Sequence, residues 1–293
     1  MNVYLKNFIL LNQEQEEKVR DFERRTCFNI FYPLGIFPDK DFKQIEFEPV
    51  TIFYGGNGSG KSTLLNIIAT RLNLLRSVPF EPGQFFDWYV NATSFNNLWS
   101  DDWNCIPIES RILTSEDVFD KTLNLRKRNH DINNHRDALT QEWQASKNTN
   151  YGNITTIHGS EYDTWKRRYT LKKTSNSNIV KKEVGFNIKT GSNGENAFKF
   201  FLEQMKADTL YLLDEPENSL SAQWQTELAQ YIEGMARFER CQFVIATHSP
   251  FLLGIRGAKI YDLDTPGVPV RPWTELENVR EYYSFFKSRE SEF

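Results

Sequence analysis

Residues 55–63 read Gly55-Gly56-Asn57-Gly58-Ser59-Gly60-Lys61-Ser62-Thr63, and this stretch decides the fold of the chain. It satisfies the pattern G-x-x-x-x-G-K-[ST], whose glycines let consecutive backbone N–H groups turn inward around a phosphate. The lysine adds a positive charge, and a helix that starts there adds its N-terminal dipole. An ordinary glycine-rich turn is the alternative, so the flanking sequence has to separate the two.

The sequence on both sides of this loop fits a strand leading in and a helix leading out. Val50-Thr51-Ile52-Phe53-Tyr54 is a continuous β-branched and aromatic run, which predicts a strand buried on both faces. Apolar residues then recur at helical spacing between Ser62 and Leu75. We therefore predict a phosphate-binding loop, with Lys61 on the β- and γ-phosphates and the Ser62 hydroxyl on Mg²⁺.

Two further apolar runs end in residues that suit phosphate chemistry. Tyr211-Leu212-Leu213 leads into Asp214 and Glu215, and Val244-Ile245-Ala246-Thr247 leads into His248. Acids at a strand end often lie in a solvated loop, but open α/β sheets also bind their ligands at the carboxyl ends of strands. We predict that Asp214 holds Mg²⁺, that Glu215 polarises the attacking water, and that His248 donates to the γ-phosphate.

The rest of the chain alternates between strand-like and helix-like segments. We predict strands at 8–11, 44–48 (at a sheet edge), 50–54, 209–213, 242–246 and 258–262, and helices at 12–25 with Asn12 as N-cap, 62–75, 197–205, 224–232 and through Val279 and Phe285. Residues 79–102 show no clear period. The alternation predicts an α/β fold with a mostly parallel sheet.

The composition is that of a folded protein, with 39% hydrophobic and 25% charged residues among 293. No apolar run approaches the roughly 18–20 residues of a membrane span, and none suits a signal-peptide core. The three cysteines (Cys27, Cys105 and Cys241) form neither a disulfide framework nor a zinc pattern. We therefore expect a cytoplasmic protein without a membrane partner.

The charge is divided unevenly along the chain. Residues 121–190 hold fourteen Lys or Arg and six Asp or Glu, a net charge of +8, so the remainder carries −12 of the total of −4. Because no other change in composition is as sharp, we predict three parts: 1–120, the basic segment 121–190, and 191–293.

The basic segment leaves its role open. Its first half is helical in pattern, 147–160 reads as a loop or weak hairpin, and the absence of a sustained heptad argues against a long coiled-coil arm. Residues 161–169 interleave aromatic and basic side chains, as nucleic-acid surfaces do. The alternatives are a solvated helical subdomain and a surface for a protein partner.

Taken together, these motifs resemble those of the ATP-binding-cassette (ABC) ATPase superfamily, in its soluble, non-transporter branch with SMC- and RecF-like proteins. Gly55–Thr63 matches Walker A, Leu210–Glu215 matches Walker B, His248 matches the switch histidine, and Gly191-Ser192-Asn193-Gly194-Glu195 matches the signature loop. The amino-acid sequences of 214–221, 246–253 and 260–264 resemble those of small stand-alone predicted ATPases of the bacterial AAA family. The similarity covers residues 30–75 and 185–290.

The resemblance implies a P-loop NTPase fold of the ABC-ATPase type, flanked by helices and carrying an inserted basic helical subdomain. It implies Mg²⁺-dependent ATP hydrolysis by a head-to-tail homodimer that sandwiches two ATPs, with the Ser192 hydroxyl and the Gly194 N–H on the γ-phosphate in trans. Glu215, His248 and Lys61 would be catalytic, and Ser62 and Asp214 would hold the metal. ATP would be bound by Gly55, Gly56, Asn57, Gly58, Ser59, Gly60, Lys61, Ser62, Thr63, Ser192, Gly194 and Tyr32. Ser192 and Glu195 also form a capping box, which is compatible with this role.

Some family positions are uncertain or altered. The aromatic residue that stacks on adenine could be Phe31, Tyr32 or Phe37, of which we choose Tyr32. No glutamine fits the Q-loop. Gln84 lies only 23 positions after Lys61, which is too near, and Gln141 and Gln144 lie in the polar segment. Ser221 replaces the usual D-loop aspartate, and Asn193 replaces a small residue of the signature.

The biological role is open at this stage. One alternative to an ATPase is a nucleotide-gated binding module with little hydrolysis, and another, disfavoured because no membrane span is present, is a transporter subunit. Analogy at the level of the fold suggests DNA maintenance or anti-phage (antiviral) defence. The expected partners are DNA or RNA through 121–190, or a separately encoded effector protein.

Overall fold

The chain forms two compact units, which are described separately. The computed structural model describes residues 3–23, 31–80, 82–97, 106–148, 160–184, 186–188 and 191–293. One unit comprises Met1–Phe119 and Ser192–Phe293, and the other comprises Asp120–Gly191. Cys27, Cys105 and most of the predicted loop 147–160 lie outside the described residues.

A five-stranded parallel sheet forms the centre of the first unit, which confirms the predicted α/β fold. The strand order is β5-β6-β7-β3-β8, and every neighbouring pair is parallel. The strands are β3 (Val50–Tyr54), β5 (Arg111–Thr114), β6 (Leu210–Asp214), β7 (Gln242–Thr247) and β8 (Lys259–Asp262). All four of the strands predicted at 50–54, 209–213, 242–246 and 258–262 are present within one residue of their expected limits.

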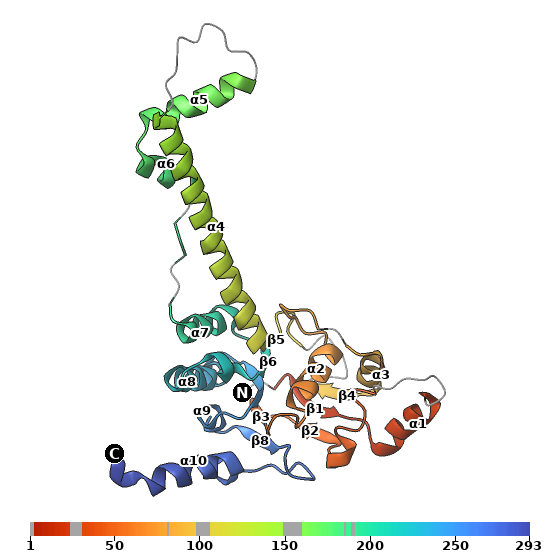
Figure 1. Ribbon diagram of the computed structural model, residues 1–293. Coiled ribbons are helices and arrows are strands. Elements are labelled where there is room, and N and C mark those ends of the chain that lie inside the picture. The colour runs from red at the N-terminus through yellow and green to blue at the C-terminus, as the bar shows by residue number, and fades with distance from the viewer. Residues whose placement is uncertain are drawn as a thin grey trace. The chain divides into compact units, whose positions relative to one another are not determined.

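Apolar side chains cover both faces of this sheet, which explains the continuous apolar runs. In β3, Phe53 belongs to the core on one face, while Ile52 and Tyr54 belong to the core on the other. Helices lie on both sides (Figure 1). On the Phe53 face these are α2 (Lys61–Arg71) and α3 (Gln84–Ala92), and on the other face they are α7 (Asn193–Gln204), α8 (Ala222–Phe238), α9 (Pro250–Leu253) and α10 (Glu277–Ser288). Such two-sided cover is the usual environment of a parallel sheet.

A small antiparallel sheet packs on the Phe53 face of the central sheet, and part of it was not predicted from the sequence. Its order is β2-β1-β4, with β1 at Leu5–Ile9, β2 at Gln44–Glu46 and β4 at Ser94–Asn97. The predicted edge strand is confirmed as β2, but β1 begins three residues before the predicted 8–11. Helix α1 (Gln13–Glu23) starts at Asn12, whose Oδ1 accepts the Gln15 N–H at 2.9 Å, as predicted for its cap. Helix α3 and β4 occupy part of 79–102, for which the sequence showed no period.

The strand order decides which loops meet. Because β7 lies between β3 and β6, the loops at the carboxyl ends of these three strands are neighbours in space. The register places Tyr54 opposite Thr247, and Asp214 opposite Ala246. The phosphate loop, His248 and the Asp214–Glu215 pair therefore share one edge of the sheet.

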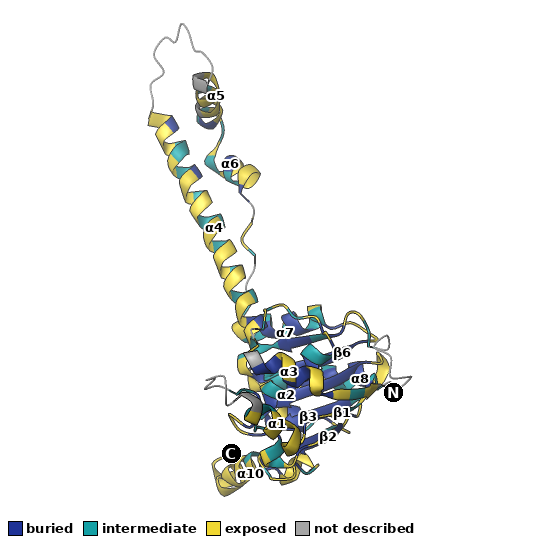
Figure 2. Cartoon of the chain, turned by 90° about the vertical axis from the view of Figure 1, so that its right-hand side faces the viewer, coloured by how far each residue is buried: buried dark blue, intermediate teal, exposed yellow. Residues whose placement is uncertain are grey.

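The second unit is helical. Helix α4 (Ser115–Asn148) has 34 residues, and α5 (Ser160–Lys173) and α6 (Asn176–Glu183) return beside it, as Figure 2 shows. Trp143 Nε1 donates to the Thr174 carbonyl at 2.9 Å, and Arg167 pairs with Glu142 at 2.7 Å. The helical subdomain is confirmed, but so long a single helix was not expected from the sequence. Polar contacts of this kind, with a few buried apolar residues such as Leu139 and Leu171, join α4 to the returning helices. They take the place of the apolar heptad seam of a coiled coil.

The described residues also answer the question of membrane spans. None of their helices combines the length and the apolar character that crossing a bilayer requires.

Candidate active site

The loop between β3 and α2 has the glycine-dependent geometry of an anion site. Gly58 and Gly60 have φ of 82° and 96°, a left-handed region in which other residues are strained. A Cβ on Gly60 would lie 2.8 Å from Ile36 Cγ2, and one on Gly55 would lie 2.6 Å from Ser59 Oγ. The predicted glycines are thus required by backbone angle and by close packing, and the nest of N–H groups precedes the first turn of α2.

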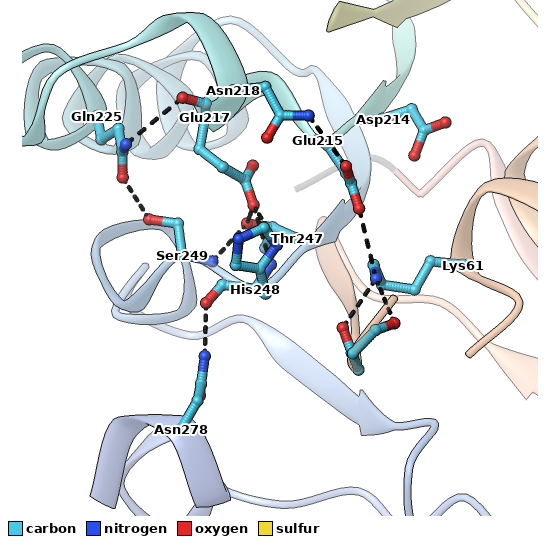
Figure 3. Close-up of polar contacts among 12 residues, drawn as sticks. Lys61, Asp214, Glu215, Glu217, Asn218, Gln225, Thr247, His248, Ser249 and Asn278 are labelled. Carbon is cyan, nitrogen blue, oxygen red and sulfur yellow. Dashed lines mark hydrogen bonds and ion pairs between the residues drawn. The ribbon is translucent and has the colours of Figure 1, made fainter. Parts of the chain in front are cut away.

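Lys61 lies at the centre of this loop, with its side chain only 3% exposed (Figure 3). Its Nζ donates to the carbonyls of Gly55 at 2.8 Å and Gly56 at 3.0 Å, and lies 3.5 Å from Glu215 Oε1. The ammonium group is therefore held where the loop and the end of β6 meet, in position to face an anion in the loop.

Ser62 and Asp214 form the pair predicted to hold a metal. Ser62 Oγ donates to Asp214 Oδ1 at 2.9 Å, which joins the start of α2 to the end of β6. Burial raises the pKa of Asp214 to about 6, in spite of the opposing hydrogen bond from Ser62. One hydroxyl and one carboxylate suit Mg²⁺, which keeps several waters and uses few protein ligands beside phosphate oxygens. Among the described residues there is no group of three or more His, Cys, Asp or Glu that could hold an ion.

Glu215 points away from its neighbour because the chain turns sharply at this residue. Its φ is 45°, an unusual value for a residue other than glycine, and its N–H donates to the Ala246 carbonyl at 2.9 Å. The carboxylate lies between Lys61 and Asn218, whose Nδ2 donates to Oε2 at 3.0 Å. The two adjacent acids thus have separate environments, as separate roles require.

The loop that carries His248 is held by Glu217, a residue that the sequence gave no reason to select. Glu217 Oε1 accepts the Thr247 hydroxyl at 2.6 Å and the His248 N–H at 2.9 Å, and lies 3.4 Å from His248 Nδ1. The Glu217 side chain is 5% exposed, whereas that of His248 is 45% exposed. Its only sequence signal was a third acid shortly after Asp214, which does not distinguish a buried anchor from a solvated loop.

Two more contacts fix this loop. Asn278 Nδ2 donates to the His248 carbonyl at 2.7 Å, and Ser249 Oγ donates to Gln225 Oε1 at 2.6 Å (Figure 3). The loop that carries the histidine is therefore tied to α8 and α10 as well as to the turn Pro216–Ser219 after β6.

The signature residues lie at the start of α7. Ser192 Oγ accepts the Glu195 N–H at 3.2 Å, so the predicted capping interaction is present. A Cβ on Gly194 would lie 2.9 Å from Trp224 Cδ1 and 3.6 Å from the Ser221 nitrogen. Gly194 is thus needed for the close approach of α8, and it lies beside the predicted D-loop position. No hydrogen bond between described residues joins Ser192 or Gly194 to the phosphate loop of the same chain.

The candidates for adenine stacking differ in their surroundings. The Tyr32 hydroxyl donates to Thr63 Oγ1 at 3.0 Å, and the Tyr32 ring stacks on Phe86. Phe37 is fully buried and packs near Gly60, so it has no free ring face. Tyr32, which is half-buried and close to the start of α2, stays our prediction for the stacking residue, with Phe31 as the alternative.

A cavity of about 310 Å³ adjoins Ser62, Asp214 and Glu215. The end of β5 and the start of α4 line its other side, with Thr114, Ser115 and Glu116. No glutamine is among the described residues that line it. Gln141 and Gln144 lie in α4 within the other unit.

Comparisons with known proteins place the chain in a family. Residues 83–254, more than half of the chain, match the family described as "AAA domain, putative AbiEii toxin, Type IV TA system". The SMC head domain from Thermotoga maritima is 13% identical with a TM-score of 0.40, over 92% of this chain and 99% of that one. The SMC head domain with an extended coiled coil bound to the C-terminal domain of ScpA, from Pyrococcus furiosus, is 14% identical with a TM-score of 0.38, over 84% and 95%. No curated protein matches the chain.

Proposed function

The chain belongs to this AAA-domain family, with the P-loop fold of ABC- and SMC-type ATPases, and we propose on this premise that it hydrolyses ATP with Mg²⁺. The observation that carries the proposal is the meeting of three strand ends at one edge of the sheet. They bring together Lys61, the Ser62–Asp214 pair, Glu215 and His248.

Each side chain has a separate task in this proposal. Lys61 and the N–H groups of the loop bind the phosphates, and Ser62 and Asp214 hold Mg²⁺, which shields phosphate charge when bound. Glu215 accepts a proton from the attacking water, and His248 donates a hydrogen bond to the γ-phosphate. Glu217 is a positioning residue, since it contacts the backbone and ring of His248 rather than the nucleotide loop.

We further propose that hydrolysis takes place in a head-to-tail homodimer. The start of α7 offers a helix dipole, the Ser192 hydroxyl and the Gly194 N–H, but among the described residues no hydrogen bond joins Ser192 or Gly194 to the phosphate loop of their own chain. A second copy would bring them to the γ-phosphate. ATP would then join the two chains.

The Glu215→Gln variant tests both the base and the dimer. It should bind ATP, hydrolyse it at least about 100-fold more slowly, and accumulate as a dimer in size-exclusion chromatography with light scattering. Glu227→Gln, an exposed acid on α8, is the matched control and should behave as the wild type. Wild-type turnover in Glu215→Gln would show that Glu215 is not the base.

One observation favours a second function, a nucleotide-gated binding module with slow hydrolysis. Glu215 is already engaged by Lys61 and Asn218, so its carboxylate is not free to orient a water until nucleotide draws Lys61 away. Steady-state turnover with and without DNA or RNA separates the two functions. Turnover that stays silent under all conditions would favour the module.

We propose that the partner of the 120–191 unit is DNA or RNA. On α5, the rings of Tyr162, Trp165 and Tyr169 stack in series at 6.2 and 5.2 Å, with Lys173 Nζ 4.6 Å from the Tyr169 centroid. Aromatic and basic side chains on one helix support binding by stacking and phosphate contact. Fluorescence anisotropy should show affinity that falls steeply with salt. Absent or salt-independent binding would leave a separately encoded effector as the partner.

A role in anti-phage defence or DNA maintenance is also part of the proposal. Its support is the family description, which names a toxin of a Type IV TA system. Phage plating efficiency with the wild-type gene and with the Lys61→Ala variant tests it, and equal plating on both would count against defence.

A further inference from the structure

Helix α10 presents an apolar face that the rest of its unit leaves uncovered. Val279, Tyr282, Tyr283 and Phe286 follow the spacing i, i+3, i+4, i+7, which places them on one side of the helix. Such a face is normally buried in a folded domain, yet Tyr282, Tyr283 and Phe286 are 49%, 55% and 53% exposed. Figure 2 shows α10 coloured almost wholly as exposed.

A cavity of about 720 Å³ lies against this face. Phe251 of α9 and Trp273 add further half-exposed rings to its wall, and the loop with His248 and Ser249, together with Gln225 of α8, forms another part. Its size lies within the range of about 300–1,000 Å³ that binding pockets occupy. The cavity is a second site, and no residue of the phosphate loop lines it. His248, which lines it, also belongs to the candidate active site.

A buried acceptor in this cavity has no partner. Glu217 lines it, and Glu217 Oε2 is buried without a hydrogen-bond partner among the described residues, while Oε1 is fully used by the His248 loop. An unpaired buried carboxylate oxygen costs free energy, so this wall of the cavity carries an unsatisfied acceptor behind its surface.

The charges around the face indicate the chemistry of the occupant. At 3.6 residues per turn, Arg280 and Lys287 border the apolar face on one side and Arg289 borders it on the other, whereas Glu277 and Glu281 lie on the opposite side of the helix. None of the three cations has an ion-pair partner among the described residues. Lys287 and Arg289 lie over the rings of Tyr283 and Phe285, at 5.4 and 4.8 Å. Of the three, only Arg280 lines the cavity, and Lys287 and Arg289 extend the cationic border of the apolar face beyond it. A partner that contacts this border would be acidic.

The same charges argue against a second copy of this chain. Two α10 faces in contact would bring two basic rims together, which destabilises a pair. The hollow shape also favours an inserted side chain over a flat surface. With roughly 100 Å² left exposed on each of five half-covered rings, the face offers about 500 Å², and a complex would bury about 1,000 Å² in total, the lower limit for a specific interface.

We infer that α10 and the adjoining cavity form a docking site for a short acidic segment of a partner protein, with one or more bulky apolar side chains that enter the cavity. The expected affinity is micromolar because the interface is small. Binding itself does not depend on the proposed ATPase function. Only the coupling of peptide binding to nucleotide binding depends on it. That coupling would run through His248 and its anchor Glu217, which both line the cavity.

A displayed library of random 12-residue peptides, panned on the full-length chain without nucleotide, tests this site. A parallel selection uses the Tyr283→Asp, Phe286→Asp double variant, and Phe238→Asp is the matched control because Phe238 is 74% exposed outside the cavity. We expect peptides with net negative charge and at least one Leu, Phe or Trp to be enriched on the wild type and the control. The double variant should bind them at least tenfold more weakly.

A charge reversal then tests the rim. Arg280→Glu with Lys287→Glu should weaken the selected acidic peptide at least tenfold and leave the thermal unfolding midpoint close to that of the wild type, since both side chains are exposed. Enrichment of neutral or basic peptides, or equal binding by the Tyr283/Phe286 variant, would overturn the site. Dimerisation through Tyr283, or preference for anionic phosphatidylserine vesicles over every peptide, would assign the face to another occupant and also overturn it. A failure of ATP hydrolysis would leave these results unaffected.

Discussion

The starts of helices α2 and α7 both offer a helix dipole to an anion, yet they are built differently. At α2 the preceding residues are glycines in left-handed conformations, Lys61 lies buried beside the loop, and Ser62 contacts Asp214. At α7 the Ser192 hydroxyl satisfies the Glu195 N–H, and the Glu195 carboxylate pairs with Lys199 at 2.6 Å. The first has the glycine turns, buried lysine and hydroxyl that a phosphate site within one chain requires. The second caps itself, and among the described residues no cation is aimed at an anion there, which fits the proposal that it supplies half of a site completed by another chain.

Removal of the cation from α2 should have the largest effect. Lys61→Ala should weaken ATP binding by roughly 100-fold or more, because the loop loses its only buried positive charge toward the phosphates. Titration calorimetry measures this directly. Lys199→Ala, at α7, is the control and should bind ATP as the wild type does. Binding of Lys61→Ala within threefold of the wild type would mean that α2 is not the phosphate site.

Removal of the hydroxyl from α7 should affect turnover but not binding. Ser192→Ala should leave ATP affinity unchanged and lower turnover about 10- to 100-fold, since a donor to the γ-phosphate is lost. Loss of the cap alone costs about 1 kcal/mol of stability. Ser175→Ala removes the equivalent cap of α6, where Ser175 accepts the Asn178 N–H, and controls for that cost. Equal turnover in both serine variants would reduce the role of Ser192 to capping.

A change at Glu217 should act on the α2 site alone and more weakly. Glu217→Gln keeps an acceptor for the Thr247 hydroxyl but removes the charge beside His248 Nδ1. We expect kcat to fall about tenfold with KM unchanged, because a positioning residue alters the γ-phosphate contact rather than ATP binding. A rise in KM at constant kcat would contradict this role.

The smallest effect on catalysis should come from Glu16, which supports the turn behind the phosphate loop and acts on stability instead. Glu16 Oε2 accepts the Gly35 N–H at 2.5 Å, next to Ile36, which packs on Gly60. Burial raises the pKa of Glu16 to about 7 from the ordinary 4.5. Between these values the folded state binds more protons than the unfolded state, so stability falls as pH rises, by up to about 3 kcal/mol.

Glu16→Gln should remove this dependence and be the more stable form at pH 8. Urea unfolding at pH 5 and pH 8 measures the difference for both proteins. The same pH dependence in the variant and the wild type would show that Glu16 is not the group responsible.

The sequence sufficed for four of the five parallel strands because each is an apolar run covered on both faces, whereas β5, in which only Ile112 and Leu113 are buried, was not predicted. Continuous apolar runs such as Val50–Tyr54 have no competing interpretation once a glycine loop follows. The antiparallel sheet was harder to predict, since β1 pairs through the polar Asn7 and starts before its apolar run. Helix α4 was underestimated because its stability comes from polar contacts between α4 and the returning chain, which leave no heptad.

The candidate site shows the same division. Lys61, Ser62, Asp214 and His248 follow loops or strands whose pattern is local, so sequence alone predicted where they meet. The role of Glu217 depends on a contact between the turn after β6 and the loop after β7, which no local pattern encodes. The cavity beside α10 arises from the packing of α8, α9 and α10. Its one sign in the sequence is the recurrence of aromatic residues at helical spacing in α10.

The most direct test of the shared site mixes two variants that are each impaired in ATP hydrolysis. Lys61→Ala has a damaged α2 site and an intact α7 start, and Ser192→Ala has the reverse. In an equimolar mixture, half of the dimers should pair one of each and contain one intact composite site, which would restore up to about a quarter of wild-type turnover. Steady-state ATP hydrolysis in the mixture that does not exceed the mean of the two separate variants would contradict a site built from two chains.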